Sequence, residues 1–401
     1  MRIGFVLNDL RLSGGVNVAL QHASRMASRG DEVFLLIREE IADDWYKPLL
    51  GNAVVVPPQH WKDGSYDIAI ATYWETLLVL GEVNSKSYVW FCQLYEDRFF
   101  PDRNPSISSM QIAGSIPLPV ITEAHWLQDQ IISENRDRSV EVVLNGIDKE
   151  VFTELKNPHN PGEGFTVLIE GSLDALAKNT AFAIEGSLTS KEVTTITHVG
   201  NRPYETDDSR YQFITGGLSF LQMAELYRTH HVQVKTPIAE GMFGPPLEGF
   251  HCGLPAIVTP VTGAEEYIED GVNSIVVLWD DTAGLGQAID NLARNPELWK
   301  RLQKGARETA QSWPDWDSQS AKFRESLLKV ARTSKLTRAD LGNLGQTIQF
   351  ADMMHWLAMR RLSDKSSGPR TMEELMFGPP AKDTSFVDKV KRRLQSLKGS
   401  A

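Results

Sequence analysis

Short apolar runs alternate with helix-length amphipathic segments along most of this chain, and this alternation constrains the fold more than any other feature. The runs at residues 2–7 (RIGFVL), 32–37 (EVFLLI) and 165–171 (FTVLIEG) are almost continuously apolar, which is typical of strands buried on both faces. Strands that alternate with helices form parallel sheets covered on both sides. A chain of 401 residues is also long for one hydrophobic core. The sequence therefore predicts an α/β protein with two parallel sheets in two domains.

The apolar runs divide into two groups. We expect the first sheet to contain RIGFVL, EVFLLI, YDIAIA, SYVWFC, LPVIT and VEVVL, and the second FTVLIEG, TTITHVG, YQFI, HVQVK, PAIVT and SIVVL. The segment KNPHNPGEG between them is rich in Pro, Gly and Asn and predicts a boundary near residue 160. After the first run, the loop NDLRLSGG leads into a helix expected from Val16 to about Gly30. Gly14 and Gly15 would allow a ligand to approach the backbone at its start.

Composition excludes several classes of protein. Hydrophobic residues make up 41% and charged residues 23%, as in ordinary globular proteins. The net charge of −11 argues against a nucleic-acid binder, whose surface is basic. No apolar run reaches the roughly 20 residues that a membrane-spanning helix needs, and the first run reads as a strand instead of a signal peptide. We therefore expect a cytoplasmic protein, in which Cys92 and Cys252 are buried thiols.

The segment IAEGMFGPPLEGFHCGLP, residues 238–255, combines a sharp turn with the start of a short helix. Gly241 and Gly244 allow the turn, Pro245 and Pro246 suit the first turn of a helix, and Gly253 suits its end. Backbone N–H groups and the positive end of the helix dipole would then face the turn. The pattern favours a diphosphate site.

Glu240 and Glu248 lie eight positions apart, one before this turn and one within the helix. Glu240 can accept hydrogen bonds from sugar hydroxyls, and Glu248 can accept two from a ribose diol. The alternative is a surface turn with two solvated acids, which is the usual fate of a glutamate pair. The spacing alone does not decide between the two interpretations.

The residues around this pair resemble the E-x7-E segment of the retaining nucleotide-sugar glycosyltransferases of family four, the group 1 transferases. The run PLEGFHCGLPAIVTPVTGAEEYIEDGVNSIVV is similar to the family's order of helix, Gly-x-Pro turn, strand, Gly-x-x-Glu loop and Asp-Gly-x-Asn turn. The resemblance is highly specific over about residues 160–330, moderate over 1–150 and absent after about 335. It implies the GT-B fold, in which two Rossmann-like domains with parallel sheets face each other across a cleft.

The resemblance also implies how the chain is divided. The expected parts are an N-terminal, acceptor-side domain (1–155), a nucleotide-sugar domain (160–310), a returning helix that packs on the N-terminal domain (311–334) and a helical, partly disordered extension (335–401). The apolar residues at 344–362 have helical spacing, and we expect the Met and Trp side chains there to pack against the body.

The family's donor contacts can be placed on this sequence. Lys178 fits a lysine that contacts the diphosphate, whereas Ser172 stands where the family commonly has an arginine, and Arg202 is another candidate cation. A lone Lys in a loop is more often a solvated charge. Glu240 is the expected catalytic residue, and Tyr227 is expected near the base. The full expected donor set is Gly15, Lys178, Tyr227, Glu240, Gly241, Met242, Phe243, Gly244, Pro245, Leu247 and Glu248.

A second segment concerns the acceptor. SYVWFCQLYEDRFFP, residues 87–101, resembles a strand and loop of transferases that build rhamnose-containing bacterial cell-surface polysaccharides, and so suggests a rhamnosyltransferase. Gln93, Tyr95 and Glu96 would face the acceptor, and Tyr73 or Trp74 would stack on a sugar. The alternative is that the aromatic residues belong to the core.

These features predict a retaining hexosyl or deoxyhexosyl transferase that uses a nucleotide sugar and a glycan or lipid-linked acceptor. The family is thought to need no divalent metal, and we expect no other cofactor. Alternatives are transfer to a small molecule, or a catalytically silent subunit that binds a partner enzyme. From residue 335 onwards the chain has 12 basic and 7 acidic residues. The end, residues 386–401, could form an amphipathic helix with a weak contact to the inner face of the cell membrane, or simply a solvated helix.

Overall fold

Two parallel sheets organise the computed structural model, which describes residues 1–40, 44–95, 107–154 and 164–363. The first has the order β3-β2-β1-β4-β5-β6-β7 and the second β10-β9-β8-β11-β12-β13. The first sheet comprises β1 (Arg2–Leu7), β2 (Glu32–Ile37), β3 (Val54–Val56), β4 (Ser65–Ala71), β5 (Asn84–Cys92), β6 (Val120–Thr122) and β7 (Val140–Val142). The second comprises β8 (Phe165–Glu170), β9 (Val193–Gly200), β10 (Tyr211–Thr215), β11 (Val232–Lys235), β12 (Ala256–Val258) and β13 (Ser274–Val276).

Every predicted strand is present, and β3 is an addition. It is three residues long, its residues are exposed or half-buried, and it pairs with β2 at the edge of the sheet. The apolar run at 53–56 is short and is followed by Pro57 and Pro58, which are typical of a turn or loop. The predicted boundary near residue 160 lies outside the described residues.

Helices connect the strands and cover both faces of each sheet. Their bounds are α1 (Gly14–Ser28), α2 (Trp74–Val79), α3 (Ile107–Gly114), α4 (His125–Glu134), α5 (Thr180–Thr189), α6 (Phe220–Thr229), α7 (Gly244–His251), α8 (Thr282–Arg294), α9 (Pro296–Ser312), α10 (Trp316–Ala331) and α11 (Arg338–Ser363). Short 3-10 helices include η2 (Leu80–Glu82), η5 (Leu176–Lys178) and η6 (Ala264–Glu266).

Helix α1 begins two residues before its predicted start. Ser13 is extended, and its side chain accepts a hydrogen bond from the Val16 N–H, so it caps the helix. Gly14 and Gly15 therefore form the first turn of α1 and are not part of a loop. A side chain on Gly15 would begin 3.3 Å from Gln93 Oε1, at the end of β5. The glycine keeps this helix start close to the neighbouring strand.

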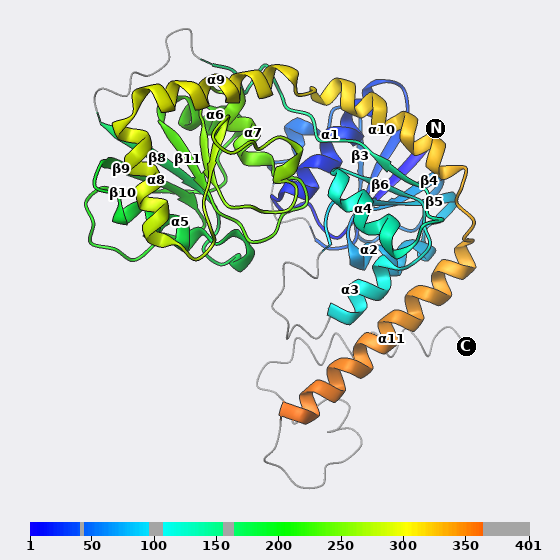
Figure 1. Ribbon diagram of the computed structural model, residues 1–401. Coiled ribbons are helices and arrows are strands. Elements are labelled where there is room, and N and C mark those ends of the chain that lie inside the picture. The colour runs from blue at the N-terminus through cyan, green and yellow to red at the C-terminus, as the bar shows by residue number, and fades with distance from the viewer. Residues whose placement is uncertain (41–43, 96–106, 155–163, 364–401) are drawn as a thin grey trace.

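The two sheets lie in separate lobes, with α9 and α10 running along one side of both (Figure 1). Helix α10 packs on the first lobe, where Arg25 pairs with Asp317 at 3.1 Å and His22 bonds Ser320 at 3.1 Å. The chain therefore returns to its first lobe after it has built the second.

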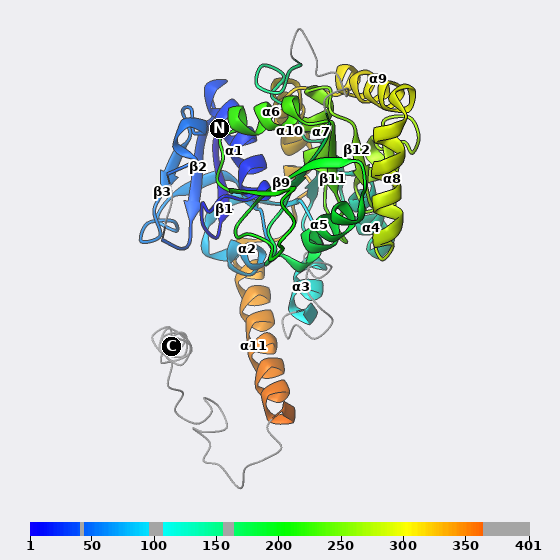
Figure 2. The same cartoon turned by 90° about the vertical axis from the view of Figure 1, so that its left-hand side faces the viewer.

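Helix α11 contacts the first lobe near its start and then projects away from it (Figure 2). Leu341 and Ile348 are buried, and Gly345 lies so close to Leu78 that a Cβ would come within 1.9 Å of the Leu78 carbonyl oxygen. Phe350 and Met354 are 59% and 49% exposed. The prediction that the methionines of this segment pack against the body is therefore wrong for Met354, which lies on an exposed side of the helix, whereas Met353 is half-buried.

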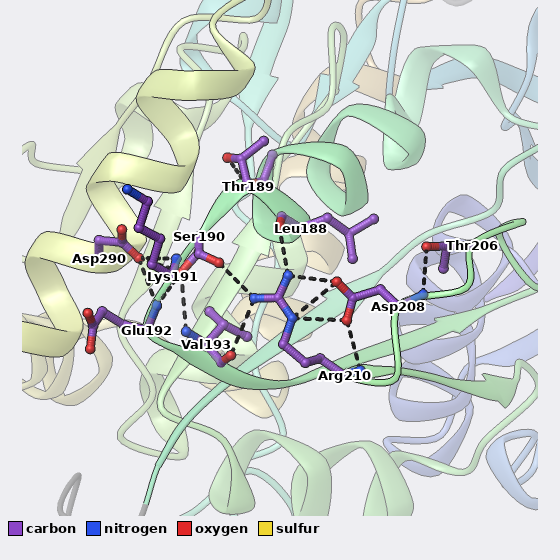
Figure 3. Close-up of polar contacts among 11 residues, drawn as sticks. Leu188, Thr189, Ser190, Lys191, Glu192, Val193, Thr206, Asp208, Arg210 and Asp290 are labelled. Atoms are coloured by element: carbon purple, nitrogen blue, oxygen red, sulfur yellow. Dashed lines mark hydrogen bonds and ion pairs between the residues drawn. The ribbon is translucent and has the colours of Figure 1, made fainter.

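A single arginine organises the end of α5 in the second lobe. Figure 3 shows the Arg210 guanidinium, which donates to the carbonyls of Leu188 and Ser190 at 2.7 Å and pairs with Asp208 at 2.7 Å. Asp290 of α8 accepts hydrogen bonds from the same turn, including one from the Ser190 hydroxyl at 2.5 Å. The bonds from Arg210 satisfy carbonyls that the end of a helix leaves without partners.

Candidate functional site

Strand order places a candidate site at the carboxyl ends of β8 and β11. These strands are neighbours, but the chain continues from β8 towards β9 and from β11 towards β12, on opposite sides. Ligands of open α/β sheets bind where the strand order reverses in this way. The loops that follow the two strands carry Lys178 and Glu240.

Lys178 and Glu240 form an ion pair at this point. The Lys178 ammonium donates to both carboxylate oxygens of Glu240, at 2.8 and 2.9 Å. The Glu240 side chain is 9% exposed and that of Lys178 is 32% exposed, so the lysine can reach a ligand without leaving its partner. Burial opposes the charge on Lys178, but Glu240 and then Glu170 outweigh it and raise the pKa of the lysine. The lysine therefore stays cationic.

The backbone beside Lys178 has an unusual conformation. Asn179 has φ of 50°, in the left-handed region, and it is the residue from which α5 starts. Asparagine tolerates this region better than most residues. Its carbonyl accepts a hydrogen bond from the Thr236 hydroxyl at 3.2 Å, which ties the loop after β8 to the loop after β11.

Glu248, the second acid of the motif, bonds Tyr227. The Tyr227 hydroxyl donates to Glu248 Oε2 at 3.1 Å, and Tyr227 itself is buried. Burial, and then the charge of Glu170, raise the pKa of Glu248 to about 8. Tyr227 therefore orients the Glu248 carboxyl group through this hydrogen bond. Its own ring is buried and has no exposed face on which a nucleotide base could stack.

The turn between the two acids is closely packed. Met242, Phe243 and Leu247 are buried, so they could reach a donor only through their backbone groups, whereas Gly244 and Pro245 are half-buried. Proline occupies two of the first three positions of α7, as predicted. Because proline has no N–H, the start of this helix offers fewer donors to a diphosphate than an ordinary helix does, and the charge of Lys178 matters more.

Sequence reasoning missed a second ion pair at the same strand ends. Lys235, 3% exposed at the end of β11, donates to the Glu170 carbonyl at 2.7 Å and also pairs with the Glu170 carboxylate. Lys235 outweighs the effect of burial and lowers the pKa of Glu170. Each residue ends a predicted strand, but the sequence does not show that these two strands are neighbours. Arg202, by contrast, pairs with Asp174 at 2.8 Å in an exposed position.

The predicted acceptor residues are divided between surface and core. Tyr95 is half-buried, and its hydroxyl donates to Glu134 at 3.0 Å. Trp74 is buried in the first turn of α2, while Tyr73 is half-buried just before it. Gln93 lies between Gly15 and the second lobe, since a Cβ on Gly241 would come within 1.8 Å of its carbonyl oxygen. Glu96 lies outside the described residues.

Glu123 is another acid that the sequence did not single out. It is 5% exposed at the end of β6, where it accepts hydrogen bonds from the Met242 N–H at 3.2 Å and from Asn145 Nδ2 at 3.0 Å. Burial is the main cause that raises its pKa to about 8, and Glu240 adds to the shift. Among the described residues no group of three His, Cys, Asp or Glu side chains could hold a metal ion.

Comparisons with known proteins match parts of this chain to glycosyltransferases. Residues 165–295 match the family of group 1 glycosyl transferases. The chain is 36% identical over 86 residues to the putative glycosyltransferase EpsD of Bacillus subtilis (strain 168). This aligned segment covers 21% of this chain and 23% of EpsD. It is 25% identical over 204 residues to the uncharacterized glycosyltransferase MJ1178 of Methanocaldococcus jannaschii, which covers 48% of this chain and 55% of MJ1178. The chain thus spans only about a quarter and about half of these relatives.

The structural comparison covers more of the molecule. The crystal structure of Anabaena Alr3699/HepE in complex with UDP and glucose superposes with a TM-score of 0.66 at 18% identity, over 82% of this chain and all of that one. The predicted GT-B fold, with two facing Rossmann-like domains, is confirmed. In the described part of the chain, no helix has the length and apolar character to cross a membrane.

Proposed function

We propose that this protein is a retaining glycosyltransferase that moves a hexosyl or deoxyhexosyl group from a nucleotide sugar to a glycan or lipid-linked acceptor. One observation carries the proposal. The Lys178–Glu240 pair lies at the point where the strand order reverses, within the segment that matches the group 1 glycosyl transferases. This combination supports a site for an anionic donor with a sugar attached.

The chemistry needs position and charge more than it needs a strong base. The bond between the anomeric carbon and the diphosphate breaks, and its electron pair leaves with the phosphate oxygen. The acceptor oxygen forms the new glycosidic bond on the same face, and its proton goes to the departing phosphate. Lys178 would stabilise the charge on the phosphate, because fixed charges in a site shielded from water act more strongly than charges in water. Glu240 would orient the sugar and balance charge at the anomeric carbon.

The acceptor class rests on the resemblance of residues 87–101 to transferases of rhamnose-containing cell-surface polysaccharides. A cytoplasmic enzyme that meets a lipid-linked acceptor at the inner face of the membrane would fit this class. The crystal complex of Alr3699/HepE contains UDP and glucose, so UDP-sugars are the first donors to test. We propose that no divalent metal takes part.

Two alternatives have specific support. The half-buried Tyr73 and Tyr95 would also suit a small-molecule acceptor. Ser172, where the family commonly has an arginine, leaves one cation fewer for the diphosphate and favours a catalytically silent subunit. The retained Lys178, Glu240 and Glu248 favour the enzyme.

A panel of UDP-, dTDP- and GDP-sugars would test the proposal. Each would be assayed for hydrolysis by the protein and for its effect on thermal unfolding, with the free nucleotide as a control. A donor at 100 times its dissociation constant should stabilise the protein by about 2.7 kcal/mol. Stabilisation together with hydrolysis to a sugar of retained configuration supports the enzyme. Stabilisation without turnover, with any acceptor tried, supports the silent subunit.

A further inference from the structure

A single peptide group of the second lobe is bonded at both ends by side chains of the first lobe. The carbonyl of Gly241 accepts a hydrogen bond from Trp126 Nε1 at 2.6 Å, and the N–H of Met242 donates to Glu123 Oε1 at 3.2 Å. These two atoms belong to the same peptide plane. That plane is the second peptide group after Glu240, in the turn that leads to α7.

Glu123 and Trp126 come from one short segment. Glu123 follows β6, and Trp126 is the second residue of α4. Between them, the N–H and the ring of His125 both bond Glu266 of the second lobe, the ring at 2.7 Å. Since Ala124 provides no side-chain cap, Glu266 caps α4 from the other lobe. The start of α4 therefore forms several hydrogen bonds between the first lobe and the second.

Packing leaves the Gly241 peptide little freedom. A Cβ on Gly241 would lie 1.8 Å from the Gln93 carbonyl oxygen, and a Cβ on Gly263 would lie 2.3 Å from the Gly241 carbonyl oxygen. The peptide is thus held between the end of β5 and the loop before η6. Rotation of its plane would break both hydrogen bonds to the first lobe and bring the carbonyl against one of these neighbours.

The hydrogen bonds of Glu123 allow its carboxyl group to hold the Met242 N–H in place. Its second oxygen accepts from Asn145 Nδ2, and the Asn145 Oδ1 atom is buried without a hydrogen-bond partner among the described residues. The O and N ends of a side-chain amide have nearly the same shape, so the Asn145 amide can turn by 180° and present Oδ1 to residue 123. A glutamine at position 123 could therefore accept from the Met242 N–H and donate to Asn145 Oδ1.

We propose that Glu123 and Trp126 are positioning residues that orient the Gly241–Met242 peptide and so place the Glu240 carboxylate. Contact between the lobes would complete the donor turn, because the second lobe alone lacks both hydrogen-bond partners of this peptide. The proposal deepens the transferase function and its effect on turnover rests on that function, but the structural role can be tested without it.

Hydrogen exchange of the full-length protein, followed by mass spectrometry, tests the structural role. In Glu123→Ala, a peptide spanning residues 241–247 should exchange about tenfold faster than in the wild type, because the Met242 N–H loses its hydrogen-bond partner. Glu123→Gln should stay close to the wild type. Glu266→Gln is the matched control, since Glu266 also joins the lobes but touches neither atom of the peptide. Unchanged exchange in Glu123→Ala, or equal acceleration in Glu266→Gln, would overturn the proposal.

Kinetics distinguish positioning from direct catalysis. At saturating donor, turnover in Glu123→Ala should fall about tenfold or more, and Glu123→Gln should recover it to within about threefold. Trp126→Phe should lower turnover as Glu123→Ala does, and the double variant should lose less than the product of the two effects, because both act on one peptide. If Glu123→Gln is as inactive as Glu123→Ala, the carboxylate acts directly and the positioning role is wrong.

Two outcomes separate this inference from the proposed function. If the wild-type protein neither binds nor turns over any nucleotide sugar, the transferase proposal fails, while the exchange experiment still decides whether the first lobe holds the peptide. Should Glu123→Ala fail to fold, Trp126→Phe provides the same comparison, and normal exchange in that variant would overturn the inference.

Discussion

At the residue scale, the surroundings of Glu240 allow the effect of its charge to be tested apart from the effect of its hydrogen bonds. Its carboxylate is nearly buried and bonds the Lys178 ammonium through both oxygens. A neutral amide of the same shape could still bond the lysine but could not balance its charge. The pair therefore allows a substitution that keeps the packing and changes the electrostatics.

We predict that Glu240→Gln lowers turnover far more than donor affinity. Turnover should fall about 100-fold at saturating donor, because charge that develops at the anomeric carbon loses its counterion. The dissociation constant of the donor, measured by calorimetry, should change less than about threefold. Wild-type turnover in this variant would remove Glu240 from the catalytic role.

Glu248 should act on binding instead of turnover. In Glu248→Ala the ribose diol would lose its hydrogen-bond partner, which costs about 1–3 kcal/mol of donor affinity. Tyr227→Phe is the matched control, since it removes the hydroxyl behind Glu248 and leaves the carboxyl group in place. Calorimetry with the donor would show an unchanged affinity in Glu248→Ala if Glu248 does not touch the ribose.

The raised pKa of Glu248 has a consequence for stability. Its pKa is about 8 in the folded protein, above the ordinary glutamate value of 4.5, so folding favours the protonated form. This contribution is fully present below about pH 4.5 and is lost as the pH rises to about 8. Glu248→Gln removes the titrating group, and we expect its urea midpoint to change less between pH 5.5 and 8 than that of the wild type. Equal pH slopes in the two proteins would contradict the assignment.

At the scale of elements, an arginine in each lobe donates hydrogen bonds to carbonyls between the end of a helix and the next strand. Arg138 donates to the carbonyls of Gly114, Ile116 and Leu118, at 2.6–2.7 Å, between α3 and β6. Arg210 does the same between α5 and β9 (Figure 3). The planar guanidinium can reach several carbonyls at once, which a lysine cannot do.

We predict that Arg210→Met destabilises the protein by about 2 kcal/mol, because partly buried carbonyls at the end of α5 lose their donors. Arg202→Met is the control, since the pair of Arg202 with Asp174 is exposed to solvent and should contribute little to stability. Urea unfolding of the two variants, followed by circular dichroism, measures the difference. Equal losses would show that the Arg210 contacts add nothing beyond a surface ion pair.

At the scale of the whole molecule, α10 and α11 extend the first lobe with residues from the far end of the chain (Figure 1). Residues 386–401, the basic segment for which a weak membrane contact and a solvated helix are the two interpretations, lie outside the described residues. Their role can be tested by truncation, because α10 and the site at β8 and β11 are formed by earlier parts of the chain.

Deletion of residues 386–401 should lower recovery with vesicles of anionic lipid at low salt and leave activity on a water-soluble acceptor analogue almost unchanged. Basic side chains next to a small apolar face give a contact that salt screens. At high salt the full-length and truncated proteins should sediment alike. Equal sedimentation at low salt as well would mean that the segment is only a solvated or packed helix.

The local features of this fold were predictable from the sequence. The continuous apolar runs predicted β1, β2 and β8, and proline at the start of α7 placed that helix. The family resemblance also singled out Lys178, although as a contact of the diphosphate and not as the partner of Glu240. In each case the signal lies within a few residues, where backbone preferences and side-chain spacing act directly.

The contacts that complete the site belong to the tertiary structure. Glu123 and Met242 are 119 positions apart, and Lys235 and Glu170 are 65 apart. Neither Glu123 nor Glu170 belongs to a recognisable local motif. The sequence by itself determined the alternating elements, the two sheets and the turn that carries Glu240. Only the packing of one lobe against the other decided what holds that turn, because hydrogen bonds between distant segments depend on where whole sheets come to lie, and no local pattern records that.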